Sequence, residues 1–150
     1  MVTRGYYGNP QATKDAFVDG WFCTGDIATW KNGMPYIVDR KKELIKYKGL
    51  QVAPAELEAL LLTHPKIFDA AVIGINTPST EAPRAYVVTA GDITEQEIKD
   101  FVKKNAADYK QLRGGVVFLK AIPKSPSGKI LRKDLREMAN KEAEGFRAKL

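Results

Sequence analysis

The chain has 150 residues, of which 44% are hydrophobic, and this combination fits one ordinary folded domain rather than a disordered segment. Its formal net charge of +6 favours anionic ligands such as phosphates, without choosing among nucleotide, CoA, nucleic acid and membrane surface. The single cysteine, Cys23, excludes an internal disulfide and fits a reducing compartment. No apolar run is long enough for a membrane span, and we expect no secretory signal at the N-terminus.

Residues 1–39 are rich in glycine and aromatic residues and show little helical periodicity. The pair Asn32-Gly33 lies between two apolar runs, 27–30 and 36–38, which predicts a β-hairpin with a type I′ turn. The charge cluster 39–43 follows it. We interpret this cluster as a joint between two structural units.

The elements predicted after the joint form a small α+β domain, a sheet with helices packed on it. Apolar periodicity, the proline at the first turn of a helix and one capping box define these elements. In chain order they are the ribbon 44–52 with a turn at Lys48-Gly49, a helix from Pro54 to about His64, strands 70–75 and 85–88, a helix after the capping box Thr94–Glu97, a strand 116–119 and a last helix carrying Leu131, Leu135 and Met138.

Two segments before residue 50 could bind a nucleotide. Thr24-Gly25-Asp26 offers a carboxylate to ribose hydroxyls, although a locally stabilised turn explains this tripeptide better when it is taken alone. The stretch from Arg40 to Lys48 is rich in basic residues interleaved with apolar ones. Strand alternation would point Lys46 and Lys48 to one face, which suits phosphates, but a solvated charged face explains the pattern equally well.

The loop 123–129 is similar to a phosphate-binding loop but is not a Walker A motif, because Pro123 and Ile130 stand where that motif needs glycine and Ser or Thr. It is expected to present Lys129 at its tip as a point charge, and an ordinary exposed lysine is the alternative. His64 lacks the partners of a metal site or a catalytic triad, so we reject hydrolase chemistry. Nucleic acid binding is a weak alternative, because the basic residues lack the aromatic pattern of a recognition sheet.

Three separated motifs, however, closely resemble those of 4-coumarate–CoA ligase, firefly luciferase and related acyl-CoA synthetases of the adenylate-forming superfamily. They are Trp21-Phe22-Cys23-Thr24-Gly25-Asp26, the run from Ile37 to Glu58 that includes Asp39-Arg40-Lys41-Lys42-Glu43, and the run from Ile122 to Arg132 that includes Ser127-Gly128-Lys129. The resemblance extends over nearly the whole chain in the right order. It replaces the simpler interpretations of Asp26 and Lys129 with functional ones.

The resemblance implies an acid–thiol ligase that uses ATP and CoA. An acid is first activated as an acyl-adenylate with release of pyrophosphate, and the CoA thiol then displaces AMP. Between the two steps a small C-terminal lid domain rotates about a hinge. We therefore expect residues 1–39 to be the remnant of the large AMP-binding domain, 40–42 the hinge and 43–150 the lid. The phosphate loop, the acyl pocket and the glutamate that holds Mg²⁺ in this family belong to the rest of the large domain, so we expect the chain alone to be inactive and that domain to be its partner.

The same resemblance assigns roles to individual residues. Lys129 and Lys46 are the catalytic lysines, and Lys129 enters the pocket for adenylation. The residues expected to bind the nucleotide are Asp26 and Arg40, at the ribose, and Gln51, which with Lys46 contacts the adenylate. Lys42 is the hinge, and Lys48-Gly49 borders the CoA tunnel in the thioester-forming pose. The two lysines are expected on opposite faces of the lid.

Two alternatives stay open: a luciferase-like monooxygenase that oxidises its adenylate, and a non-catalytic interaction module that retains the lid fold. The tripeptide Ala148-Lys149-Leu150 matches a peroxisomal address of the Ser-Lys-Leu type, which predicts an import receptor as a partner and a peroxisomal, otherwise cytoplasmic, location. Gly145 predicts a break that lets this tail leave the last helix.

Overall fold

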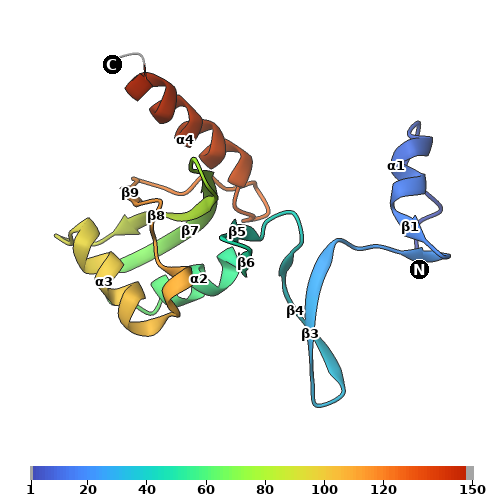
Figure 1. Ribbon diagram of the computed structural model, residues 1–150, viewed down its shortest axis with the longest axis horizontal. Coiled ribbons are helices and arrows are strands. Elements are labelled where there is room, and N and C mark those ends of the chain that lie inside the picture. The colour runs from blue at the N-terminus through green and yellow to red at the C-terminus, as the bar shows by residue number, and fades with distance from the viewer. Residues whose placement is uncertain (1, 148–150) are drawn as a thin grey trace. The chain divides into compact units, whose positions relative to one another are not determined.

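The computed structural model describes residues 2–147. The chain divides into two compact units at the peptide bond between Lys42 and Glu43 (Figure 1). Unit 1 is the part up to Lys42, and unit 2 is the part from Glu43 onward.

Unit 1 is built from short elements. Helix α1 (Pro10–Asp15) begins with proline and is capped by the Asn9 side chain, which accepts a hydrogen bond from the Ala12 amide at 2.9 Å. Two-residue strands β1 (Phe17–Val18) and β2 (Trp21–Phe22) pair antiparallel. These three elements were not predicted, since six helical residues and two-residue strands are too short to show a periodicity.

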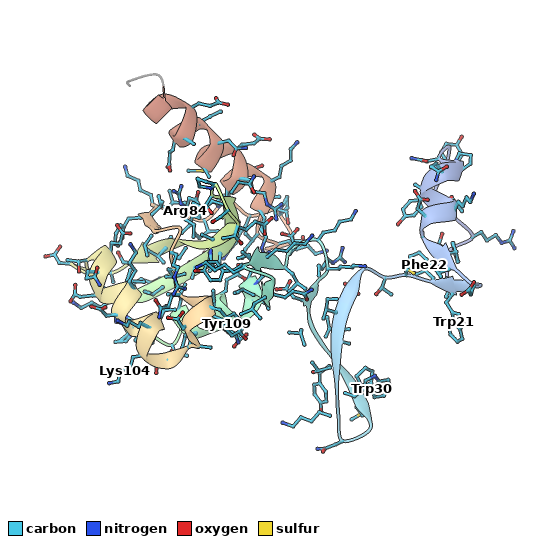
Figure 2. All side chains as sticks on the ribbon, viewed as in Figure 1. Trp21, Phe22, Trp30, Arg84, Lys104 and Tyr109 are labelled. Carbon is cyan, nitrogen blue, oxygen red and sulfur yellow. The ribbon has the colours of Figure 1, made fainter. Side chains whose placement is uncertain are left out.

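The predicted hairpin of unit 1 is confirmed. Strands β3 (Asp26–Lys31) and β4 (Met34–Arg40) pair antiparallel across the two-residue turn Asn32-Gly33. Both turn residues have positive φ, 52° and 75°, as a type I′ turn requires. Figure 2 shows Trp30 projecting from this hairpin.

Unit 2 contains a ribbon, a three-stranded sheet and helices, which confirms the predicted α+β class. The ribbon pairs β5 (Ile45–Tyr47) with β6 (Leu50–Val52). The sheet has the order β7-β8-β9, in which β7 (Ile67–Asn76) and β8 (Glu81–Thr89) are antiparallel and β9 (Val116–Phe118) is parallel to β8. The helices are α2 (Pro54–Leu61), α3 (Glu95–Asn105), the short 3-10 helix η1 (Asp108–Lys110) and α4 (Arg132–Arg147).

The sheet of unit 2 is covered on both faces (Figure 1). Alternate strand residues point to opposite faces: Ala70 and Val72 pack with α2, α3 and the ribbon, whereas Ala71, Ile73 and Tyr86 pack with α4. Burial raises the pKa of the Tyr86 phenol, whose hydroxyl donates to the Leu135 carbonyl at 3.3 Å. The two cores hold the ribbon and α4 on one rigid support.

The predicted break at Gly145 is wrong. Helix α4 continues through Gly145 to Arg147. One glycine costs a helix only about 1 kcal/mol relative to alanine, so it does not end a helix unless it adopts the left-handed conformation of a C-terminal cap. Within residues 2–147, no helix has both the length and the apolar character needed to cross a bilayer.

Candidate functional site

Asp26 and Arg40, the two residues predicted to hold the ribose, lie side by side in unit 1. They are direct partners in the β3–β4 register, and the Arg40 Nε atom lies 3.3 Å from the Asp26 carboxylate. The Asp26 amide donates to the Thr24 hydroxyl at 3.1 Å, which fixes the start of β3. Both side chains keep exposed surface, so an anionic or hydroxyl-bearing ligand can reach them.

Lys42, the predicted hinge, lies in a turn that follows β4. The residue before it is tied to unit 1, because the Lys41 amide donates to the Gly25 carbonyl at 2.8 Å. The residue after it is tied to unit 2, because the Glu43 carboxylate accepts from Arg136 at 2.6 Å. Lys42 is therefore the residue between two local anchors.

The ribbon of unit 2 brings Lys46 and Gln51 together as direct cross-strand partners. Ile45 and Tyr47 are buried while Lys46 is exposed, as the predicted alternation requires. Adjacent to this pair, Lys48 and Gly49 form the turn with φ of 46° and 82°. Lys48 therefore lies outside the strand, so its direction is set by the turn and not by alternation. Its Nζ lies 5.6 Å from the centroid of the Tyr47 ring.

The ribbon backbone is fastened to the turn between β7 and β8. The Thr80 hydroxyl accepts from the Lys48 amide and donates to the Lys46 carbonyl, each at 2.7 Å. The Glu81 carboxylate accepts from the Lys46 amide at 2.7 Å. These contacts leave the Lys46 side chain free to meet a ligand while its backbone stays in place.

Lys129 lies on a different segment, a tight loop before α4. The Ser125 amide donates to the Lys129 carbonyl at 2.8 Å, and the Gly128 amide donates to the Ser125 carbonyl at 2.9 Å. The tip of the loop is therefore 126–128, and Lys129 directly follows it rather than standing at the tip as predicted. Lys124 ties the loop to β7 through the Asp69 carboxylate at 2.6 Å.

The structure also shows charged residues that the sequence did not single out. Glu58 is buried on α2, where its carboxylate accepts a hydrogen bond from the Val72 amide at 2.9 Å. One guanidinium nitrogen of Arg132 donates to both carboxylate oxygens of Glu58, at 2.7 and 2.8 Å. Glu43 receives Arg136. The sequence signal for a buried Glu58 was its position next to Leu57 on the inward side of a predicted helix. Its partner Arg132 is 74 residues away, so the pairing itself had no local signal.

The predicted site residues of unit 2 thus form two separate features, the ribbon with Lys46, Lys48, Gly49 and Gln51, and the loop with Lys129. The predicted targeting residues Ala148, Lys149 and Leu150 lie outside the described residues. In the described part of the chain, no group of three or more His, Cys, Asp or Glu side chains is arranged to hold a metal ion.

Comparison with known proteins places these features in a family. Residues 56–129 match the AMP-binding enzyme C-terminal domain. A protein of Emericella nidulans named as an acyl-coenzyme A synthetase is 56% identical over the full chain, and 4-coumarate:CoA ligase 1 of Petunia hybrida is 54% identical over 91% of it. The peroxisomal OPC-8:0-CoA ligase 1 of Arabidopsis thaliana is 52% identical over 92% of the chain.

The chain spans 28% of the Emericella protein and 26% of each of the two plant ligases. Among solved structures, ATP-bound MatB from Rhodopseudomonas palustris superposes with a TM-score of 0.83 at 30% identity, over 90% of this chain and 28% of that one. The sequence identities and the shared fold agree with the three motifs. The chain therefore belongs to the adenylate-forming acyl-CoA synthetases, as a C-terminal part of such an enzyme.

Proposed function

We propose that unit 2 is the rotating lid of an ATP-dependent ligase that converts a carboxylic acid, ATP and CoA into acyl-CoA, AMP and pyrophosphate. One observation carries this proposal: two exposed lysines, Lys46 and Lys129, stand on separately fastened segments of one small unit, and Lys42 alone separates the anchors of the two units. One site can use both lysines in turn if the lid reorients between half-reactions.

In the first half-reaction a carboxylate oxygen attacks the α-phosphorus of ATP, and the bond to pyrophosphate breaks. Negative charge increases on the α-phosphate oxygens as this happens. The ammonium group of Lys129, held between the carboxylate and the α-phosphate, would offset that charge. Asp26 would accept hydrogen bonds from the ribose hydroxyls of the same nucleotide, and Arg40 would donate hydrogen bonds to them.

In the second half-reaction the CoA sulfur attacks the acyl carbonyl carbon, and AMP leaves. Lys46 and Gln51 would contact the adenylate, and the Lys48-Gly49 turn would line the path of the CoA thiol. Gly49 has φ of 82° and no side chain, which lets a ligand approach the backbone closely. Mg²⁺ supplies charge neutralisation at the phosphates in such reactions, and we assign no residue of this chain to it.

The complete ligase needs a large N-terminal domain as the partner of this lid, with a phosphate loop and an acyl pocket. We therefore expect the isolated chain to give no ATP–pyrophosphate exchange with any acid.

The test is Lys129→Ala in the complete enzyme. We expect adenylation, measured by ATP–pyrophosphate exchange, to fall about a hundredfold or more, since one contact to a transition-state charge is worth on the order of 2–4 kcal/mol. Thioester formation from supplied acyl-adenylate should stay largely intact. Lys133→Ala is the matched control, because Lys133 is an exposed lysine four residues away on α4. Equal loss of both half-reactions in Lys129→Ala would refute the two-step use of the lid.

We also propose that Ala148-Lys149-Leu150 directs the enzyme to peroxisomes wherever Leu150 is the free C-terminus. The peroxisomal ligase among the relatives supports this proposal. A fluorescent protein ending in this tail should co-localise with peroxisomal markers and become diffuse when Leu150 is deleted. Diffuse fluorescence before the deletion would contradict the proposal.

A further inference from the structure

The start of unit 2 and the start of α4 are joined by a network of four charged side chains, defined by Glu43, Glu58, Arg132 and Arg136. Arg136 donates to the Glu43 carboxylate at 2.6 Å, and the Arg132 Nε atom lies 3.8 Å from the same carboxylate. Arg132 donates to both oxygens of Glu58 at 2.7 and 2.8 Å. Two carboxylates meet two guanidinium groups, so the formal charges balance.

The side chains of this network are partly shielded from solvent, and Arg136, at 42%, is the most exposed of them. The side chains of Arg132 and Glu58 are 18% and 12% exposed, and that of Glu43 is 26% exposed. Partial burial strengthens charge-assisted hydrogen bonds relative to those on an open surface, and it makes the loss of one partner costly. Arg132 Nε is buried and, among the described groups, has no hydrogen-bond partner, so the nearby Glu43 carboxylate is what compensates it.

The position of Arg132 indicates that its cation serves to pair with Glu58 and Glu43, and not to stabilise helix α4. Arg132 is the first residue of α4, where the partial positive charge of the helix N-terminus disfavours a cation. Glu58 and Glu43 offset that repulsion. Because the Leu131 amide donates to the Pro123 carbonyl at 2.9 Å, the same helix start also closes the loop that carries Lys129.

Glu43 therefore links the first residue after the predicted hinge to the start of α4. It immediately follows Lys42, and its carboxylate contacts Arg132 and Arg136 in the first two turns of α4, the helix that follows the Lys129 loop in the chain. We propose that Glu43 is a positioning residue that makes the exit of the hinge and the Lys129 loop move as one body, so that rotation at Lys42 delivers Lys129 to a defined position. This inference rests on the proposed function and adds a residue to it.

The first test is a double-mutant cycle in the complete enzyme with Glu43→Gln, which keeps the size of the side chain and removes its charge. We expect Glu43→Gln to lower the rate of adenylation about ten- to a hundredfold, since a displacement of about 1 Å can cost this much. In the Lys129→Ala background the same change should have little further effect, because the group it positions is gone. Thioester formation from supplied acyl-adenylate should change less than adenylation does.

The matched control is Glu56→Gln. Glu56 is also a carboxylate paired with a cation, Lys110, with a distance of 2.7 Å to Oε2, but it contacts neither the hinge nor the Lys129 loop. Both half-reactions should keep their rates in this variant. If Glu43→Gln lowers adenylation by the same factor with and without Lys129, Glu43 does not act through Lys129 and the inference is wrong.

A second measurement needs no activity. Hydrogen exchange of the 150-residue chain should show faster exchange in segment 123–131 for Glu43→Gln and unchanged exchange there for Glu56→Gln. Unchanged exchange in both variants would overturn the coupling itself. If Lys129→Ala spares adenylation, the proposed function fails, and hydrogen exchange still decides whether Glu43 supports the loop.

Discussion

Asp26 and Arg40 are opposite each other in the β3–β4 hairpin, with 3.3 Å between the Arg40 Nε atom and the Asp26 carboxylate. Arg40 has 72% of its side-chain surface exposed, so this ion pair contributes about 0–1 kcal/mol to folding. The pair is thus poorly suited to a purely structural role. Its arrangement instead keeps an acceptor and a donor together on an open surface.

Asp26→Asn in the complete enzyme should raise the KM for ATP while leaving the melting temperature nearly unchanged. The carboxylate would no longer accept from ribose hydroxyls as strongly, whereas little folding energy is lost. Steady-state kinetics and a thermal melt of the same preparation check both parts. A fall in melting temperature with an unchanged KM would identify Asp26 as a structural residue instead.

Lys42→Pro should block the complete reaction while sparing one half-reaction. Proline fixes φ and restricts the residue before it, so the backbone between the anchors at Lys41 and Glu43 loses its freedom. Lys42→Ala is the control, because it removes the charge and keeps the backbone mobile. The overall rate and each half-reaction are measured for both variants. A proline variant with the parental overall rate would show that rotation about Lys42 is unnecessary.

Thr80→Val should weaken thioester formation more than adenylation. Valine has nearly the same shape as threonine but cannot hold the Lys46 carbonyl and the Lys48 amide, so the ribbon turn loosens. The lost hydrogen bonds should also lower the free energy of unfolding by about 1–2 kcal/mol. The KM for CoA measures the effect on thioester formation, and unfolding in urea measures the effect on stability.

The control for this change is Thr63→Val, which removes a hydroxyl that donates to the Leu60 carbonyl at 2.7 Å, away from the ribbon. It should not alter the KM for CoA. An equal rise in that KM for both variants would mean that general loosening of unit 2, not the ribbon turn, limits CoA binding.

The capping box of α3 predicts a pH-dependent contribution to stability. The Thr94 backbone amide and the Thr94 hydroxyl both donate to the Glu97 carboxylate. These hydrogen bonds, of which that from the amide has the larger effect, lower the pKa of Glu97 below the ordinary value of 4.5. Because the folded-state pKa is the lower one, the stabilisation is present above about pH 4.5 and is lost as the pH falls through the folded-state pKa.

Glu97→Gln keeps a hydrogen-bonding side chain and removes the charge. Its melting temperature should therefore lie below that of the parent at pH 7 and approach it in acid. Thr94→Ala removes the cap itself and should cost about 0.5–2 kcal/mol. A difference between Glu97→Gln and the parent that stays constant from neutral to acid pH would contradict the role assigned to the carboxylate.

Several elements of both units were predictable because their signals are local. The type I′ pair at Asn32-Gly33, the turn at Lys48-Gly49 and the capping box at Thr94 and Glu97 each depend on residues a few positions apart, and the structure confirms them. The break expected at Gly145 failed because the left-handed conformation that ends a helix is not dictated by glycine alone. The roles assigned to Asp26, Arg40, Lys46 and Lys129 stay predictions.

The sequence by itself determined the family and the α+β class, because motifs and short-range periodicities are encoded in neighbouring residues. Only the tertiary structure decided which of these residues share a segment and what holds each segment in place. Glu43 pairs with a residue 93 positions away in the sequence, and the Lys46 amide with one 35 positions away. The two partners of Glu58 are 74 and 14 positions away. Such pairs form because packing the two cores brings distant groups together and partial burial then requires each charge to find a partner, and no local pattern in the chain specifies that choice.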